Sequence, residues 1–220
     1  MKLLTFRRYY LDKYLSKESF SGRVLDIGGK KNNKRGLFTP PLSNIKSWEY
    51  LNIDKDTTPD YCCNVENIPV KDGTFDTVVM CEVLEHLETP SIALNECNRV
   101  LKDNGSLILS MPFLYAIHAD PNDYQRWTGS KIRMELKKKG FEKIEIQTMG
   151  GLFAVIYDLM HVALNNESNS FGSLKNKLMR RVFMPILSKA FLYLDKIYIY
   201  KSTSMTTGYY INARKFTILE

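Results

Sequence analysis

Several features that would indicate a metal-binding, secreted or repetitive protein are scarce or absent. Four cysteines form no C-x-x-C pair and have no histidine at ligand spacing, which argues against a zinc site or disulfide framework: Cys62, Cys63, Cys81 and Cys97. Residues 1–10 are basic but lack the apolar core of a signal peptide. There is no internal repeat and no low-complexity tract. We therefore expect a reduced, cytoplasmic setting and no metal ion.

Long hydrophobic runs are also missing. Segment 151–164 is too short to cross a bilayer and contains Asp158 and His161. Segment 182–200 is interrupted by a proline and by charged residues: Pro185, Lys189, Asp195 and Lys196. Basic residues precede it, so 174–200 could touch an anionic membrane surface: Lys175, Lys177, Arg180 and Arg181. We prefer a helical lid that packs on the core or on a second subunit, as in a homodimer.

The composition is that of an ordinary globular protein. The 220 residues are 44% apolar and 25% charged, which suits one α/β domain over 1–220. The net charge of +7 fits nucleic acid, an anionic membrane, an acidic substrate or simply a lysine-rich surface. Because no further feature favours nucleic acid, we expect no nucleic-acid partner.

Apolar runs and turn signals alternate along the chain. They predict strands at 23–27, 48–53, 61–64, 76–81, 106–111, 141–148 and 208–214, and helices at 3–20, 91–101 and 130–139. Residues 30–47 read as a loop, and Asn104-Gly105 reads as the end of the second helix. This alternation predicts a doubly wound, mostly parallel sheet. Residues 150–205 break the pattern and read as a helical insertion before the last strand.

The stretch Arg23-Val24-Leu25-Asp26-Ile27-Gly28-Gly29-Lys30 organises the chain. It reads as a buried strand that runs into a glycine turn, where the backbone can approach a ligand. Asp54 follows the next strand, 26 residues after Gly28, where a carboxylate can bind a ribose diol. A dinucleotide-dependent dehydrogenase fits poorly, because the turn lacks the G-x-G-x-x-G pattern.

Further motifs follow in order: Asn64-Val65-Glu66, Ile68-Pro69, Phe75-Asp76, Glu82-Val83-Leu84-Glu85-His86, Arg99-Val100-Leu101-Lys102 and His118 through Thr128. With the glycine turn, they resemble the class I S-adenosylmethionine-dependent methyltransferases. Within that class the chain is similar to small type-11-like enzymes associated with polysaccharide and glycoconjugate biosynthesis. The resemblance covers about residues 20–150 and the final strand, and it implies seven strands with the last antiparallel.

The resemblance also implies a cofactor site for S-adenosyl-L-methionine. Asp26, Gly28 and Gly29 would face the methionine part, and Asp54 would bind the ribose. Asn64 and Val65 would face the adenine, and Cys81 and Glu82 would approach the amino-acid end or the reacting methyl. Lys30 stands where a further glycine is usual; it would either pair with the cofactor carboxylate or weaken binding.

A second polar stretch, 118–128, follows the fifth strand. We expect His118 to act as the base towards the acceptor, with His86 as the rival candidate. Asp120, Tyr124 and Arg126 would contact the substrate, and Asp123 would assist catalysis by holding the loop or the substrate. The alternative is a structural loop in which Arg126 pairs with Asp123.

These features predict an enzyme that methylates a hydroxyl of a sugar or glycan precursor. One alternative is methyl transfer to a small lipid or quinone-like acceptor, which the apolar insertion would suit. Another is a non-catalytic binding or scaffold protein that keeps the fold.

Overall fold

The structure, a computed structural model, describes residues 4–32, 36–118, 121–165, 182–198 and 204–216. Its centre is a seven-stranded sheet with the order β3-β2-β1-β4-β5-β7-β6. The strands are β1 (Arg23–Ile27), β2 (Ser47–Asn52), β3 (Tyr61–Cys62), β4 (Phe75–Cys81), β5 (Leu101–Pro112), β6 (Phe141–Thr148) and β7 (Gly208–Lys215). Strand β7 is antiparallel to both β5 and β6, whereas β1 to β5 pair in parallel. The predicted α/β sheet with an antiparallel last strand is confirmed.

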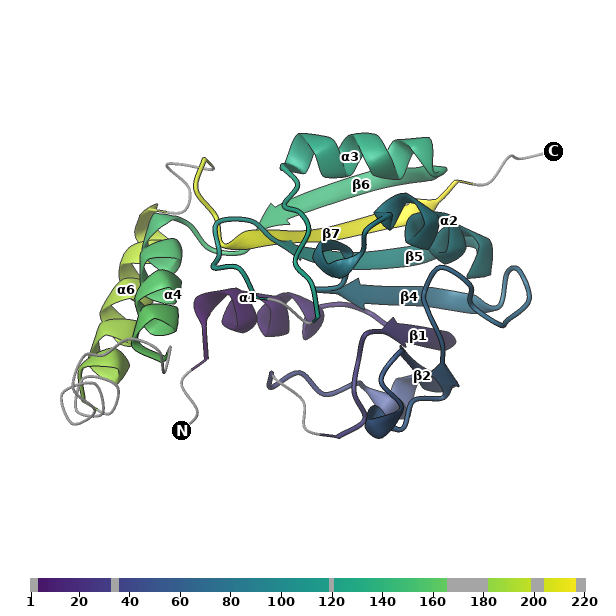
Figure 1. The fold of residues 1–220 in the computed structure, drawn as a ribbon, viewed down its shortest axis with the longest axis horizontal. Coiled ribbons are helices and arrows are strands. Elements are labelled where there is room, and N and C mark those ends of the chain that lie inside the picture. The colour runs from purple at the N-terminus through teal and green to yellow at the C-terminus, as the bar shows by residue number, and fades with distance from the viewer. Residues whose placement is uncertain (1–3, 33–35, 119–120, 166–181, 199–203, 217–220) are drawn as a thin grey trace.

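Helices cover both faces of the sheet (Figure 1). The helices α2 (Pro90–Val100) and α3 (Gly129–Lys138) pack on one face. On the other face lie α1 (Phe6–Leu15), α4 (Leu152–Asn165) and α6 (Met184–Tyr198). Side chains of β1 alternate between the two cores: Leu25 and Ile27 point to α2 and α3, and Val24 points to α1. This two-sided burial explains the continuous apolar run of that strand.

The first helix is shorter than the predicted 3–20. The Thr5 hydroxyl accepts from the Arg8 N–H at 3.3 Å, so Thr5 caps the start of α1. At the other end, Ser16 donates its backbone N–H to Asp12 and closes the helix. The chain is no longer helical at Phe20, whose ring packs against Trp48. Local capping therefore overrides the apolar spacing on which the prediction rested.

Two strand boundaries were also wrong. Strand β5 begins at Leu101, directly after the second helix ends at Val100, and not at 106. Asn104, with φ of 58°, sits in an irregular part of β5, where the pairing with β4 shifts between Phe75 and Thr77. The third strand ends at Cys62 and not at 64.

The helices between β6 and β7 support α1. Asp195 of α6 accepts the N–H groups of Gly151 and Ala154 at the start of α4, each at 3.0 Å. Asp158 of α4 in turn accepts the N–H groups of Phe6 and Arg7 at the start of α1, at 2.5 and 2.9 Å. Both carboxylates are buried, so each caps a helix N-terminus where the backbone donors lack partners. The insertion thus fixes the position of α1.

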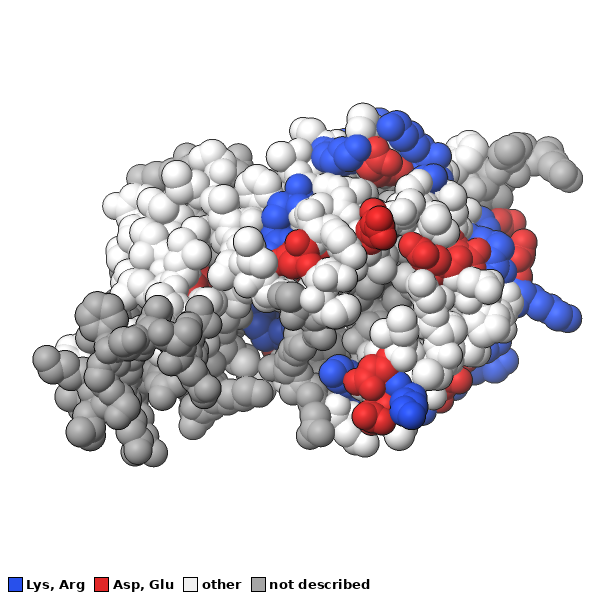
Figure 2. Space-filling view, in the orientation of Figure 1, with Lys and Arg blue, Asp and Glu red and all other residues white. Residues whose placement is uncertain are grey.

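The described parts of α4 and α6 present a largely uncharged surface (Figure 2). Its exposed apolar side chains include Leu152, Ile156, Leu159, Ile186 and Ile197. The basic residues that were expected to favour a membrane lie outside the described residues: Lys175, Lys177, Arg180 and Arg181. No helix within the described ranges has the length and apolar character needed to traverse a bilayer.

Candidate active site

A cavity of about 820 Å³ opens at the carboxyl ends of β1, β2 and β4. Side chains of α1, including Leu11 and Leu15, form one of its walls. Its volume falls within the 300–1,000 Å³ that is usual for small-molecule sites. All nine residues expected at the cofactor line it, together with two from the acceptor set: Asp26, Gly28, Gly29, Lys30, Asp54, Asn64, Val65, Cys81, Glu82, His86 and Tyr124.

The glycine turn after β1 leaves no room for side chains. Gly28 has φ of +79°, and a Cβ there would lie 2.5 Å from a methyl of Val83. A Cβ on Gly29 would lie 2.4 Å from the Asp26 carboxyl group. Backbone bonds tie this turn to β2, since Gly28 N–H donates to the Leu51 carbonyl at 2.8 Å. The turn is therefore a preformed backbone surface at the cavity floor, which fits close approach by a ligand.

Polar side chains at the ends of β2 and β3 are held by local bonds. The Asp54 carboxylate accepts from the backbone N–H of Asp56 at 3.0 Å and is exposed. Asn64 accepts from the N–H of Glu66 at 3.0 Å, and Val65 beside it is buried. These side chains keep their places at the cavity edge without a distant partner. A carboxylate, an amide and a buried apolar residue suit the diol and ring of a nucleoside.

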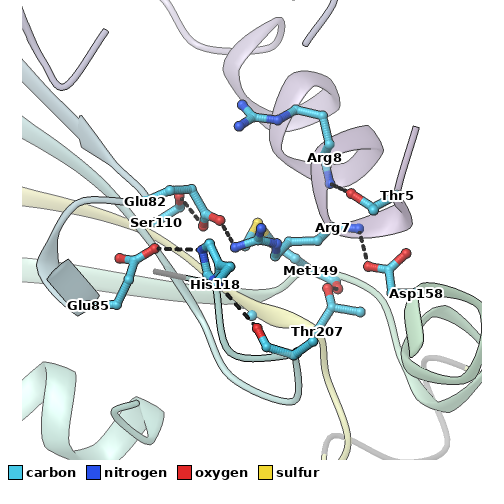
Figure 3. Close-up of polar contacts among 12 residues, drawn as sticks. Thr5, Arg7, Arg8, Glu82, Glu85, Ser110, His118, Met149, Asp158 and Thr207 are labelled. Carbon is cyan, nitrogen blue, oxygen red and sulfur yellow. Dashed lines mark hydrogen bonds and ion pairs between the residues drawn. The ribbon is translucent and has the colours of Figure 1, made fainter. Parts of the chain in front are cut away.

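Glu82 is held by residues remote in sequence. It has φ of 58°, an uncommon conformation for a residue with a side chain. Its carboxylate accepts from the Ser110 hydroxyl at 2.9 Å and pairs with the Arg7 guanidinium (Figure 3). The Arg7 guanidinium also lies over the Tyr115 ring, 3.9 Å from its centre. Sequence reasoning missed Arg7, because nothing in its spacing links it to Glu82, 75 residues away.

Cys81, next to Glu82, lines the same cavity. Burial raises the pKa of its thiol to about 12, so the thiol is neutral at pH 7. Cys81 is therefore a small apolar wall residue and not a nucleophile.

The two candidate histidines lie close together but differ in their relation to the cavity. His86, on the 3₁₀ helix η3 (Leu84–His86), lines the cavity, whereas His118 is not among the lining residues. Burial lowers the pKa of His118 to about 4, which makes its imidazole neutral at pH 7 and a weak base. The expectation that His118 faces the acceptor does not match this placement, because the loop after β5 folds its ring back towards Glu85 (Figure 3).

Contacts within the 118–128 stretch hold Asp123 and Arg126. Asp123 binds the Arg126 guanidinium through both oxygens, one at 2.6 Å, and accepts the backbone N–H of His118 at 2.9 Å. The Arg126 contact holds the pKa of Asp123 at about 2. Neither side chain lines the cavity, so this pair has the geometry expected of a structural loop. Tyr124 does line the cavity, and Asp120 lies outside the described residues.

Comparison with known proteins agrees with this geometry. Residues 42–109, less than a third of the chain, match the family model of the methyltransferase domain. An uncharacterized protein of Methanocaldococcus jannaschii is 30% identical over 136 residues, which are 57% of this chain and 54% of that protein. Malonyl-[acyl-carrier protein] O-methyltransferase of Geobacter sulfurreducens is 26% identical over 99 residues, which are 38% of this chain and 37% of that enzyme.

Among solved structures, phosphoethanolamine N-methyltransferase 2 of Haemonchus contortus in complex with S-adenosyl-L-methionine is similar, with a TM-score of 0.55 and 15% identity. The similarity covers 96% of this chain and 52% of that chain. The chain therefore has the Rossmann-like fold of the class I methyltransferases. Together with the matched domain segment, the fold supports an S-adenosylmethionine-dependent methyltransferase. The matches span about half or less of the curated relatives' lengths.

Proposed function

We propose that this protein transfers a methyl group from S-adenosylmethionine to a hydroxyl of a sugar or glycan precursor. The observation that carries the methyltransferase part is the convergence of the nine predicted cofactor residues on one cavity. Their chemistry fits the cofactor: the glycine turn offers bare backbone at the floor, and Asp54 offers a carboxylate at the edge. When bound, the cofactor supplies an electrophilic methyl group.

The chain's own residues position both reactants. Asp54 would accept hydrogen bonds from the ribose hydroxyls, and Asn64 and Val65 would flank the adenine. The Lys30 ammonium, which lines the cavity next to the glycine turn, would pair with the cofactor carboxylate. In-line methyl transfer depends chiefly on the alignment of the acceptor with the methyl group. These residues would therefore accelerate the reaction mainly by holding the reactants in position. Asp26, Cys81 and Glu82 would shape the methionine end.

The acceptor would enter beside His86 and Tyr124, which line the cavity on the β4 and β5 side. We place His86, and not His118, next to the acceptor for that reason. A hydroxyl acceptor of a sugar would find polar partners there. An alternative acceptor, a small lipid or quinone-like molecule, is favoured by the apolar wall that Leu11, Leu15 and Phe38 form.

Cofactor binding is tested by calorimetry with S-adenosylmethionine and NAD side by side. Asp54→Ala should weaken binding of S-adenosylmethionine roughly 10- to 100-fold, the size expected for hydrogen bonds to a charged group. Asp56→Ala is the matched control, because Asp56 is exposed two residues away and does not line the cavity. Equal losses in both variants, or preference for NAD, would contradict the proposal.

The acceptor is tested by methyl-group transfer from labelled S-adenosylmethionine to sugar nucleotides, to lipid-linked glycans and to quinone-like phenols. Transfer to a sugar hydroxyl supports the proposal, and transfer only to phenols or lipids supports the alternative. Tight cofactor binding with no transfer to any class favours a non-catalytic binding protein.

A further inference from the structure

Glu85 is a buried carboxylate without a hydrogen-bond donor. Its side chain is 0% exposed, and neither oxygen has a hydrogen-bond partner among the described residues. Two guanidinium groups act on it electrostatically, but both pair with other carboxylates, Arg7 with Glu82 and Arg126 with Asp123. The buried Arg126 Nε also has no hydrogen-bond partner among the described residues, and it does not reach Glu85 as a donor. Such a carboxylate is expensive to bury, so native structures normally satisfy it with a donor, a proton or a cation.

Two histidines face this carboxylate. The Nε2 atoms of His86 and His118 each lie 3.7 Å from the same Glu85 oxygen, too far for a hydrogen bond. The two rings are nearly perpendicular, with centres 5.2 Å apart. Figure 3 shows His118 turned towards Glu85.

The other ring nitrogens determine which atoms face Glu85. His86 Nδ1 lies 2.5 Å from the Asn122 carbonyl, and His118 Nδ1 lies 3.2 Å from the Ala116 carbonyl. A carbonyl oxygen only accepts, so each Nδ1 carries a hydrogen, and in the neutral imidazole each Nε2 then presents a lone pair. In that form, three acceptors converge with no donor between them. A backbone carbonyl on the far nitrogen is also the usual way in which a metal-binding histidine is oriented.

We propose that Glu85, His86 and His118 bind a divalent first-row transition-metal ion. Their ligand atoms all lie within 4.8 Å of one another. Ligands at about 2.0–2.2 Å from a tetrahedral ion are roughly 3.4 Å apart. The two Glu85–imidazole separations of 3.7 Å therefore need to contract by only a few tenths of an ångström, and the pair of imidazole nitrogens, within 4.8 Å of each other, would also have to draw together. Imidazole nitrogen with one carboxylate suits Zn²⁺, Fe²⁺, Co²⁺ and Mn²⁺ better than Ca²⁺ or Mg²⁺.

The location gives such an ion access to the cavity. His86 is both a ligand and part of the cavity lining, so the ion lies at the wall where the acceptor is proposed to bind. Three protein ligands leave at least one coordination position open for an oxygen atom.

The site differs from the sequence-based expectation of no metal. That expectation rested on cysteine spacing, whereas these ligands come from the segment after β4 and the loop after β5. The adjacent pair Glu85-His86 and the distant His118 meet only because that loop folds back, held by the bond from Tyr124 N–H to the Glu85 carbonyl at 2.8 Å.

The test measures metal binding directly and needs neither cofactor nor substrate. Chelator-treated protein is dialysed against Zn²⁺, Mn²⁺ or Co²⁺, and bound metal is measured by elemental analysis. The unaltered protein should bind one equivalent, and Co²⁺ should give visible absorption typical of nitrogen and oxygen ligands. Glu85→Gln, His86→Gln and His118→Gln should each weaken binding at least tenfold.

His161→Gln is the matched control. The sequence has three histidines, and His161, on α4, is the one outside the proposed metal site. Circular dichroism and thermal unfolding verify folding, and the metal should raise the melting temperature of the unaltered protein but not of Glu85→Gln. Less than a tenth of an equivalent bound, or equal binding by all four variants, overturns the proposal. Because the cofactor is absent from this test, its failure leaves the proposed methyl transfer untouched.

Discussion

The two halves of the cavity edge hold their polar side chains in different ways. In the nucleoside half, the ends of β1 to β3, Asp54 and Asn64 bond to backbone two residues away and remain exposed. In the acceptor half, the segment after β4 and the loop after β5, the Glu82 carboxylate pairs with Arg7, 75 residues away. Each half also has contacts of the other kind, local in Asp123–Arg126 and distant in Trp48–Asp26. Asp54 and Asn64 are thus held by local sequence, whereas the position of Glu82 depends on the completed fold.

The largest expected effect tests this dependence. Arg7→Met leaves the Glu82 carboxylate, 10% exposed, without its partner, so the free energy of unfolding should fall by about 3–5 kcal/mol. Denaturant unfolding measures it, with Lys13→Met on the same helix as control. The double variant Arg7→Met/Glu82→Leu should recover part of the lost stability, because the unpaired Glu82 charge is then removed as well. A loss below 1 kcal/mol for Arg7→Met would show that the acceptor half does not rely on this pair.

The acceptor half should also make stability depend on pH. The Arg126 contact holds the pKa of Asp123 at about 2, below its usual 3.8, so the folded state binds this proton less readily than the unfolded state does. The resulting stability is present above about pH 4 and is lost as the pH falls towards 2. Asp123→Asn should lower stability at pH 7 by roughly 2 kcal/mol and flatten this acid limb. Asp72→Asn, whose side chain is 79% exposed, should leave the limb as it is.

A smaller difference, between two glycine variants, tests the nucleoside half. Gly28 and Gly73 both have positive φ, but only at Gly28 would a Cβ collide, 2.5 Å from Val83; at Gly73 the nearest atom is 4.0 Å away. Both alanine variants incur the left-handed penalty of about 1–2 kcal/mol. Gly28→Ala should lose roughly 1–2 kcal/mol more and bind S-adenosylmethionine more weakly. Equal losses for the two variants would mean that Val83 moves aside and that the turn tolerates side chains.

The smallest effect lies outside both halves. If 174–200 contacts anionic lipid, flotation with vesicles should recover a minor fraction of the protein at low salt and none at high salt. Neutral vesicles are the control. Protein that stays at the bottom of the gradient at both salt concentrations leaves packing on the core or on a second subunit as the role of that segment.

The contrast between the halves explains what could be predicted from sequence. Strand β1, the glycine turn and Asp54 follow from short patterns, because a parallel sheet brings the carboxyl ends of its strands to one edge. Arg7 could not be found this way, since α1 reaches Glu82 only after packing on α4. The direction of the His118 ring could not be predicted for a similar reason: the sequence places it after β5, but the Asp123–Arg126 pair and the contact to Glu85 decide where its ring points.

The Asp158 cap on α1 has a consequence for biosynthesis. Asp158 follows Phe6, whose N–H it accepts, by 152 residues. A ribosome needs roughly 8–30 s to add that many residues at the usual 5–20 per second. During that interval α1 lacks the Asp158 carboxylate and the helix α4 on which it packs, and Phe6 lacks the Tyr157 ring on which it stacks. The cavity wall that α1 forms is therefore completed only after α4 has been made, and until then chaperones would be expected to bind the segment around α1.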